Sequence, residues 1–190
     1  MFSHSFAFQF IMIYKTANKL IKKIFEEDQK DRLSKKLLKY SKKKRWEIIS
    51  SRDKIRLERI KDIIKKIDCL RGVDYFRAGI IAQHSSDEEG IKLAKFLAKK
   101  GIGKNHKKSK WLHAAATDRL LIMKGKKQKY GTQYGNSNGK WFLLPVDSNT
   151  TDKERLKYNV ITLKEATQKA EKLNNGNFLS KKKIGIASKR

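Results

Sequence analysis

Three features of the sequence predict a mainly α-helical domain with a β-hairpin near the C-terminal third. Apolar residues recur at helical spacing through most of the first 124 positions. Gly72 and Gly125 each follow one of these helical patterns, and glycine is favoured at the position just after a helix. After Gly125 the chain alternates around a turn-prone Gly-Asn-Ser-Asn-Gly stretch, which is typical of a hairpin.

The first third of the chain has the pattern of a helical scaffold. Between positions 13 and 25, Ala17, Leu20, Ile21 and Ile24 form one apolar stripe. The stretch 26–45 continues as a mostly solvated helix that becomes dense in lysine. A third helical stripe, rich in isoleucine, follows from 46 to 67.

Two more helices are predicted on either side of a polar corner. Phe76, Ile80 and His84 lie four residues apart and would share one helical face. Ser85 and Ser86 then stand three residues before a glutamate each, which is capping-box spacing for a new helix that runs to Gly101. His84 would therefore lie where two helices meet. A further helix is predicted from Lys110 to Lys124.

The C-terminal third predicts a hairpin over about 128–146, with Pro145 at a strand end, and a final helix near Leu163 to Leu173. The sequence thus favours a single domain over 13–173. Residues 174–190 predict a disordered basic tail, and 1–12 a disordered or non-native leader, because Met12 directly precedes the first helical pattern.

The composition is strongly basic, with a formal net charge of +28, from 37 Lys and 10 Arg against 19 acidic residues. Such a charge attracts polyanions, and nucleic acid is one candidate partner. The excess of lysine over arginine also suits solvated helix faces. A lone Cys69 beside Leu70 predicts a core thiol in a reducing compartment, and no secretion signal or membrane-spanning run is evident. We expect a cytoplasmic protein without a membrane partner.

The segment 111–123 contains no lysine and predicts the central buried helix. Asp118 and Arg119 fall within it. A buried charge that is unpaired costs several kcal/mol, so each residue must find a partner or line a wet pocket. The alternative is that both are structural and hold down a loop.

A second polar group surrounds Gly131. In a strand, Gln128, Tyr130 and Thr132 would share one face, and Gly131 would let a ligand or another backbone approach closely. Amides and phenols orient ligands but are poor acid–base catalysts near neutral pH. We therefore interpret this group, with Gln133, as a recognition element, the alternative being a strand bend at Gly131.

His84 is the residue best suited to acid–base chemistry, because imidazole titrates near physiological pH. Asp87 or Asp118 could orient it, or His84 could be a satisfied core histidine. The sequence shows no paired Cys/His ligands, no glycine-rich phosphate loop and no nucleophile motif, so it predicts neither a metal nor a cofactor.

These motifs, in this order, resemble a bacterial family known only as domain of unknown function 6624. The resemblance covers about 20–173, and the matching elements are Glu27-Asp28-Gln29 with Arg32, Gln83-His84, Asp118-Arg119, Gln128 with Tyr130-Gly131-Thr132-Gln133, and Asp152 with Arg155. The family's Gln-His element is usually followed by a small residue and then Asp, whereas here the acid is delayed to Asp87. The family has no established reaction. The resemblance implies only that these polar residues belong to one site.

Two functions follow as hypotheses. In the first, a hydrolase or transferase acts on a small anionic ligand: His84 is the acid–base residue, Asp118 orients it, and Arg119 neutralises developing charge. The remaining residues of that pocket bind the ligand: Gln83, Gln128, Tyr130, Thr132, Gln133 and Arg155. In the second, the chain is a non-catalytic nucleic-acid or protein-binding module and the polar cluster is structural. The oligomeric state is not indicated.

Overall fold

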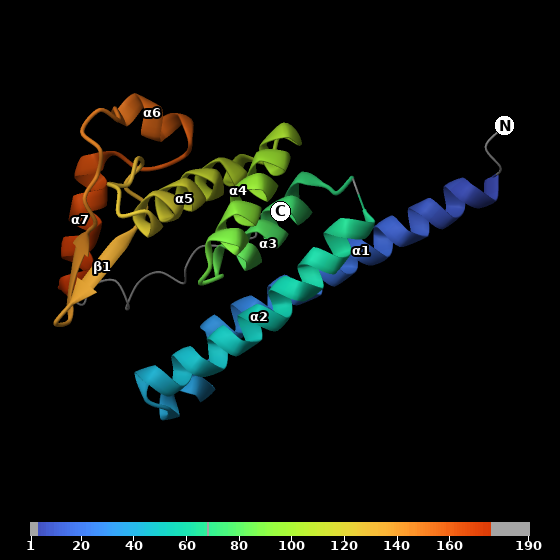
Figure 1. Ribbon diagram of the computed structural model, residues 1–190, viewed down its shortest axis with the longest axis horizontal. Coiled ribbons are helices and arrows are strands. Elements are labelled where there is room, and N and C mark those ends of the chain that lie inside the picture. Colours follow the sequence, from blue (N-terminus) through green and yellow to red (C-terminus); the bar gives the residue numbers. More distant parts are fainter. Residues whose placement is uncertain (1–3, 68, 176–190) are drawn as a thin grey trace. The chain divides into compact units, whose positions relative to one another are not determined.

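The computed structural model describes residues 4–67 and 69–175, with side chains from residue 14 onward, and confirms a mainly helical chain with one hairpin (Figure 1). Residues 1–3 of the predicted leader lie outside the described part, whereas the backbone of 4–12 is helical. The predicted tail from 176 onward also lies outside it. Where the sequence suggests one domain, the chain divides into two compact units, Met1–Ala116 and Thr117–Arg190, and each is described by itself.

The first unit opens with a helical hairpin. Helix α1 spans His4–Arg32, a short 3-10 helix η1 spans Lys35–Lys39, and α2 spans Lys42–Lys66. The two long helices run side by side in opposite directions (Figure 1). Ile21, Ile24 and Asp28 are buried on one face of α1, so the apolar stripe of this helix ends in a buried carboxylate.

Helices α3 (Gly72–Gln83) and α4 (Glu88–Gly103) pack closely together, and α5 (Lys107–Met123) follows. Gly72 was predicted to end a helix, but it begins α3. The backbone is tight there, since a Cβ atom on Gly72 would lie 2.9 Å from Cβ of His106. His84 caps the C-terminus of α3, which confirms its predicted place at a corner.

The N-cap of α4 is Asp87, not Ser85 or Ser86 as predicted. The Asp87 carboxylate accepts a hydrogen bond from the Gly90 N–H at 2.7 Å, while Ser85 Oγ accepts one from the Asp87 N–H. A carboxylate is favoured here because it also opposes the positive end of the helix dipole.

Cys69 is exposed, so the prediction of a core thiol is wrong. The neighbouring Leu70 is buried in its place. In the short link between α2 and α3, the larger apolar side chain, Leu70, faces the core and Cys69 faces solvent.

The second unit contains the hairpin of β1 (Tyr134–Ser137) and β2 (Lys140–Leu143), joined through Asn138 and Gly139, which both have positive φ. Two helices follow, α6 (Asp152–Lys157), which the sequence analysis missed, and α7 (Leu163–Asn174). Helix α7 lies along β2, where the Asn174 amide bonds both the N–H and the C=O of Trp141.

The strands are shorter than predicted, and the segment 128–133 lies outside them. The prediction that Gln128, Tyr130 and Thr132 share a strand face is therefore wrong. Gln128 makes an isolated bridge with Val146, and the chain then turns through Gly131 at φ +79°. Within the described residues, no helix is both long enough and apolar enough to cross a bilayer.

Candidate active site in the first unit

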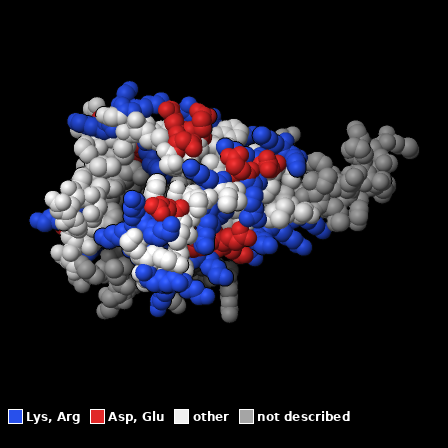
Figure 2. All heavy atoms as spheres, turned by 60° about the horizontal axis from the view of Figure 1, so that its bottom comes forward, with Lys and Arg blue, Asp and Glu red and all other residues white. Residues whose placement is uncertain are grey.

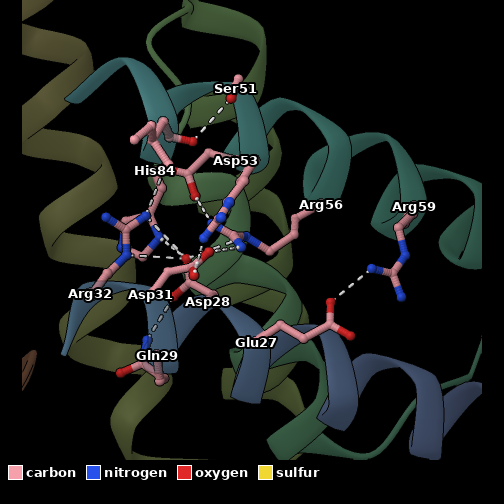
Figure 3. A network of polar contacts seen from close by, with 12 residues as sticks. Glu27, Asp28, Gln29, Asp31, Arg32, Ser51, Asp53, Arg56, Arg59 and His84 are labelled. Atoms are coloured by element: carbon pink, nitrogen blue, oxygen red, sulfur yellow. Dashed lines mark hydrogen bonds and ion pairs between the residues drawn. The ribbon is translucent and has the colours of Figure 1, made fainter. Parts of the chain in front are cut away.

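One network of polar residues in the first unit joins side chains from three helices (Figure 3). Asp28 and Arg32 lie one turn apart on α1, Asp53 and Arg56 nearly one turn apart on α2, and His84 ends α3. Asp28 is fully buried and Asp53 and Arg56 almost so. Three helices therefore meet around charged side chains rather than around an apolar contact alone.

His84 is joined to Asp28 by a 3.0 Å contact between Nδ1 and Oδ1. The imidazole is 23% exposed and the carboxylate not at all, so the ring stands between a buried charge and solvent. An ionised carboxylate only accepts hydrogen bonds. Nδ1 therefore carries the proton that is donated to Asp28, and the neutral ring has its lone pair on Nε2.

The charge on Asp28 is strongly favoured despite its burial. Burial alone raises the pKa of Asp28, but the hydrogen bond and charge of His84, followed by those of Arg32, outweigh it and hold this pKa at about 2. Gln29 adds a hydrogen bond from Nε2 to Asp28 Oδ2 at 2.7 Å. Asp28 is thus a fixed negative charge at neutral pH.

Arg32 links the two long helices through the same carboxylates. Its Nη2 lies 3.1 Å from Asp28 Oδ1 and 2.8 Å from Asp53 Oδ2. The Arg32 side chain is 30% exposed. Arg32 is therefore more accessible to a ligand from solvent than Arg56, whose side chain is 5% exposed.

Arg56 is the buried counterpart of Arg32. It donates to Asp31 and Asp53, each at 2.7 Å, and these bonds raise its pKa although burial opposes them. Its Nε, 3.8 Å from Asp28 Oδ1, has no hydrogen-bond acceptor among the described residues. The network therefore contains one buried N–H donor whose hydrogen bond is not satisfied by the described residues.

Asp28, Asp53 and His84 also offer three ligand atoms within 4.8 Å of one another, which is the geometry of a cation site. The Nη2 atom of Arg32 already bonds both carboxylates. A divalent ion bound there would have to displace this guanidinium, so we derive no chemistry from a metal.

In the second unit Asp118 is fully buried and accepts four hydrogen bonds. Their donors are the N–H groups of Lys129, Tyr130 and Thr132 at 2.8, 2.8 and 3.0 Å, and the Thr132 hydroxyl at 2.8 Å. Both carboxylate oxygens are used in holding this loop. The carboxylate in contact with His84 Nδ1 is Asp28, whereas the contacts of Asp118 are those of a residue that holds a loop.

The side-chain amide of Gln128 makes hydrogen bonds to the backbone of two neighbouring segments. Its Nε2 donates to the carbonyls of Gln133 and Leu144 at 3.0 and 2.7 Å, while its Oε1 accepts the Gln133 N–H at 2.9 Å. These bonds hold both sides of the turn ahead of the hairpin. The Gln133 side chain in turn donates to Thr132 Oγ1 at 2.9 Å.

The other predicted residues are placed as follows. Tyr130 is buried with its ring 5.0 Å from that of Tyr158, and burial raises its pKa. Arg155 is buried and donates to Thr150 O and to Asp152, while its Nε and Nη2 have no acceptor among the described residues.

Burial lowers the pKa of the half-buried Arg119. Gln83 is buried beside His84 in the first unit.

The predicted site residues therefore fall into two groups, one in each unit, and a single pocket that contains both stays a prediction. The resemblance implied that Asp28 and Arg32 belong to the site but gave neither a role, and sequence reasoning missed Asp53 and Arg56. The available signal was the position of Asp28, four residues after Ile24 and seven after Ile21, on the buried stripe of α1.

Comparisons of this chain with protein-family models, with curated proteins and with solved structures found no match. The resemblance described above accordingly rests on its motif residues alone.

We predict that Asp118→Ala lowers the free energy of unfolding by about 3 kcal/mol or more, because four donors lose a charged acceptor. Urea unfolding followed by circular dichroism measures this change. Glu171→Ala, at an exposed position on α7 of the same unit, should change stability by less than about 0.5 kcal/mol. Equal effects from the two substitutions would contradict the structural role of Asp118.

The lowered pKa of Asp28 predicts how stability depends on pH. A pKa that falls from 3.8 to about 2 on folding contributes stability above pH 4 that is lost as pH falls through 2. The total is about 2 kcal/mol. The difference in unfolding free energy between the wild type and Asp28→Asn should therefore shrink as pH falls from about 5 towards 2. A difference that stays constant over this range would show that Asp28 is not held ionised by folding.

Proposed function

We propose that His84, oriented by Asp28, is the general acid–base residue of a hydrolase or transferase that acts on a small anionic ligand. The observation that carries this proposal is the 3.0 Å contact between a fully buried carboxylate and a partly exposed imidazole. A buried carboxylate that fixes the imidazole tautomer is the arrangement by which many enzymes prepare a histidine for proton transfer.

The proton path follows from the tautomer. With Nδ1–H donated to Asp28, the lone pair of Nε2 takes a proton from the attacking hydroxyl group or water. The imidazolium that forms is stabilised by the adjacent negative charge, and it then returns the proton to the leaving group. Asp28 keeps its charge throughout and serves as the positioning residue.

Charge balance supports an anionic ligand. In this network Asp28, Asp31 and Asp53 are opposed by three arginines, Arg32, Arg52 and Arg56. An approaching anion therefore meets no net negative charge, and the partly exposed Arg32 is a donor for the negative charge that develops during the reaction.

We also propose that the chain belongs to the bacterial family known as domain of unknown function 6624. Two of the elements that carry the resemblance, Asp28 with Arg32 and Gln83-His84, are more than fifty positions apart in the sequence. They are joined by the contact between Asp28 and His84. The elements of the second unit, Asp118 and Gln128, support a loop and enter the proposed reaction no further.

The proposal is tested first by ligand screening and then by turnover. Thermal-shift assays with inorganic phosphate, nucleoside monophosphates, sugar phosphates and dicarboxylates identify an anion that stabilises the protein. Phosphate and carboxylate esters of the compounds found are then assayed for hydrolysis and for transfer to alcohols.

In these assays His84→Gln should retain the thermal shift but lose turnover by about 100-fold or more, the usual contribution of general acid–base catalysis. His106→Gln is the matched control, because His106 bonds Ser109 and stacks on Phe76 away from the network. Turnover that is unchanged in His84→Gln, or lost equally in both variants, would refute the assignment.

A further inference from the structure

A separate surface lies where α1 turns back into α2 (Figure 1). We call residues 33–46, which include all of η1, the basic corner. Four large apolar side chains are exposed within these fourteen positions, Leu33 by 68%, Leu38 by 64%, Tyr40 by 39% and Trp46 by 65%. Single exposed apolar residues are ordinary, but a group of four on one short segment indicates an interaction surface.

The same segment carries a concentrated positive charge. It has no acidic residue, and seven of its fourteen residues are basic: Lys35, Lys36, Lys39, Lys42, Lys43, Lys44 and Arg45. Lys44 pairs with the exposed Glu47 at 3.3 Å, just beyond the segment. Basic side chains also outnumber acidic ones over the face of the molecule in Figure 2.

The local structure explains why these apolar groups are exposed. Leu37 is the buried residue of η1 and holds the turn against the helices. Its neighbour Leu38 then points away from the core, and Trp46 lies in the second turn of α2 with most of its surface exposed. Lys39 Nζ lies 5.1 Å from the centre of the Tyr40 ring, so charge and aromatic surface are interleaved.

We propose that the basic corner docks this protein on an anionic lipid surface. The lysines are attracted to acidic headgroups, Trp46 and Tyr40 lie at the level of the headgroups, and Leu33 and Leu38 enter the acyl region. This is attachment to one face of a bilayer. The expectation of no membrane partner rested on the lack of a membrane-spanning run and of a secretion signal in the sequence. Attachment to one face of a bilayer needs neither.

A nucleic acid is the competing occupant, and the side chains favour lipid. Bases stack on aromatic rings, and a groove that tracks the phosphates would be expected to use arginine forks. Two of the four apolar groups are leucines, which have no role in stacking. Six of the seven basic residues are lysines, which act as point charges.

The test is co-sedimentation of the full chain with vesicles of phosphatidylcholine alone and of an equimolar mixture with phosphatidylglycerol, at low and high salt. The protein should sediment with the mixed vesicles and not with phosphatidylcholine, and salt should weaken the binding. Absence of binding to the mixed vesicles would overturn the proposal.

Two variants separate the contributions of the corner. Lys42→Gln/Lys43→Gln/Lys44→Gln should weaken binding at least tenfold, while Lys108→Gln/Lys126→Gln/Lys127→Gln, which removes the same charge from exposed positions elsewhere, should change it less than twofold. Leu33→Ser/Leu38→Ser/Trp46→Ser should also weaken binding at least tenfold. All the altered positions are exposed or partly exposed, so circular dichroism should show unchanged folding.

Equal losses in the two lysine variants, or full binding by the Leu/Trp variant, would show that diffuse charge alone attracts the vesicles and would overturn the proposal. A single-stranded oligodeoxynucleotide is assayed in parallel. If binding of the oligonucleotide depends on the residues of the basic corner and binding to the vesicles does not, the surface is a nucleic-acid site instead. In a chain with Trp111→Phe and Trp141→Phe, a blue shift of Trp46 emission on mixed vesicles supports insertion, and an unchanged spectrum contradicts it.

Discussion

The first unit depends on a set of buried ion pairs between α1 and α2, and the position of His84 follows from them. Asp28 and Asp53 are almost fully withdrawn from water, and each is bonded by a guanidinium, with Arg32 shared between them. Removing one partner of a buried pair costs about 3–5 kcal/mol, because the other charge is left uncompensated. Loss of any one of the four side chains should therefore weaken the packing of α1 on α2.

This constraint has a functional consequence. Replacing a buried ion pair by apolar residues is often neutral or stabilising, so stability alone is a weak reason to keep one. Here the pairs keep a carboxylate charged beside a histidine that solvent can reach. In the second unit the analogous buried carboxylate, Asp118, uses all its bonds on one loop, and no titratable partner is among the groups that it bonds.

Local patterns predicted most of the helices, because apolar spacing along one helix is a local property. The single helix expected over 26–45 was wrong, because α1 ends at Arg32 and the chain turns through η1 before α2 begins at Lys42. The same patterns predicted the ends of helices less well, since Gly72 could equally end one helix or begin the next, and Asp87 competed with two serines as a cap. The strand assigned to Gln128–Thr132 failed because the N–H groups of Lys129, Tyr130 and Thr132 bond the Asp118 side chain rather than a neighbouring strand. His84 could be selected from the sequence by its chemistry alone. Its partner could not be selected, because Asp28 lies 56 positions away and only the packing of α3 on α1 brings the two together.

The central claim, that Asp28 holds His84 with the proton on Nδ1, is tested most directly by long-range ¹H–¹⁵N spectra of the imidazole rings. The His84 signals are assigned by their loss in His84→Gln. The account predicts that neutral His84 carries its proton on Nδ1 in the wild type and loses this preference in Asp28→Asn. A neutral ring protonated on Nε2 in the wild type, or a tautomer that is the same in both proteins, would contradict it.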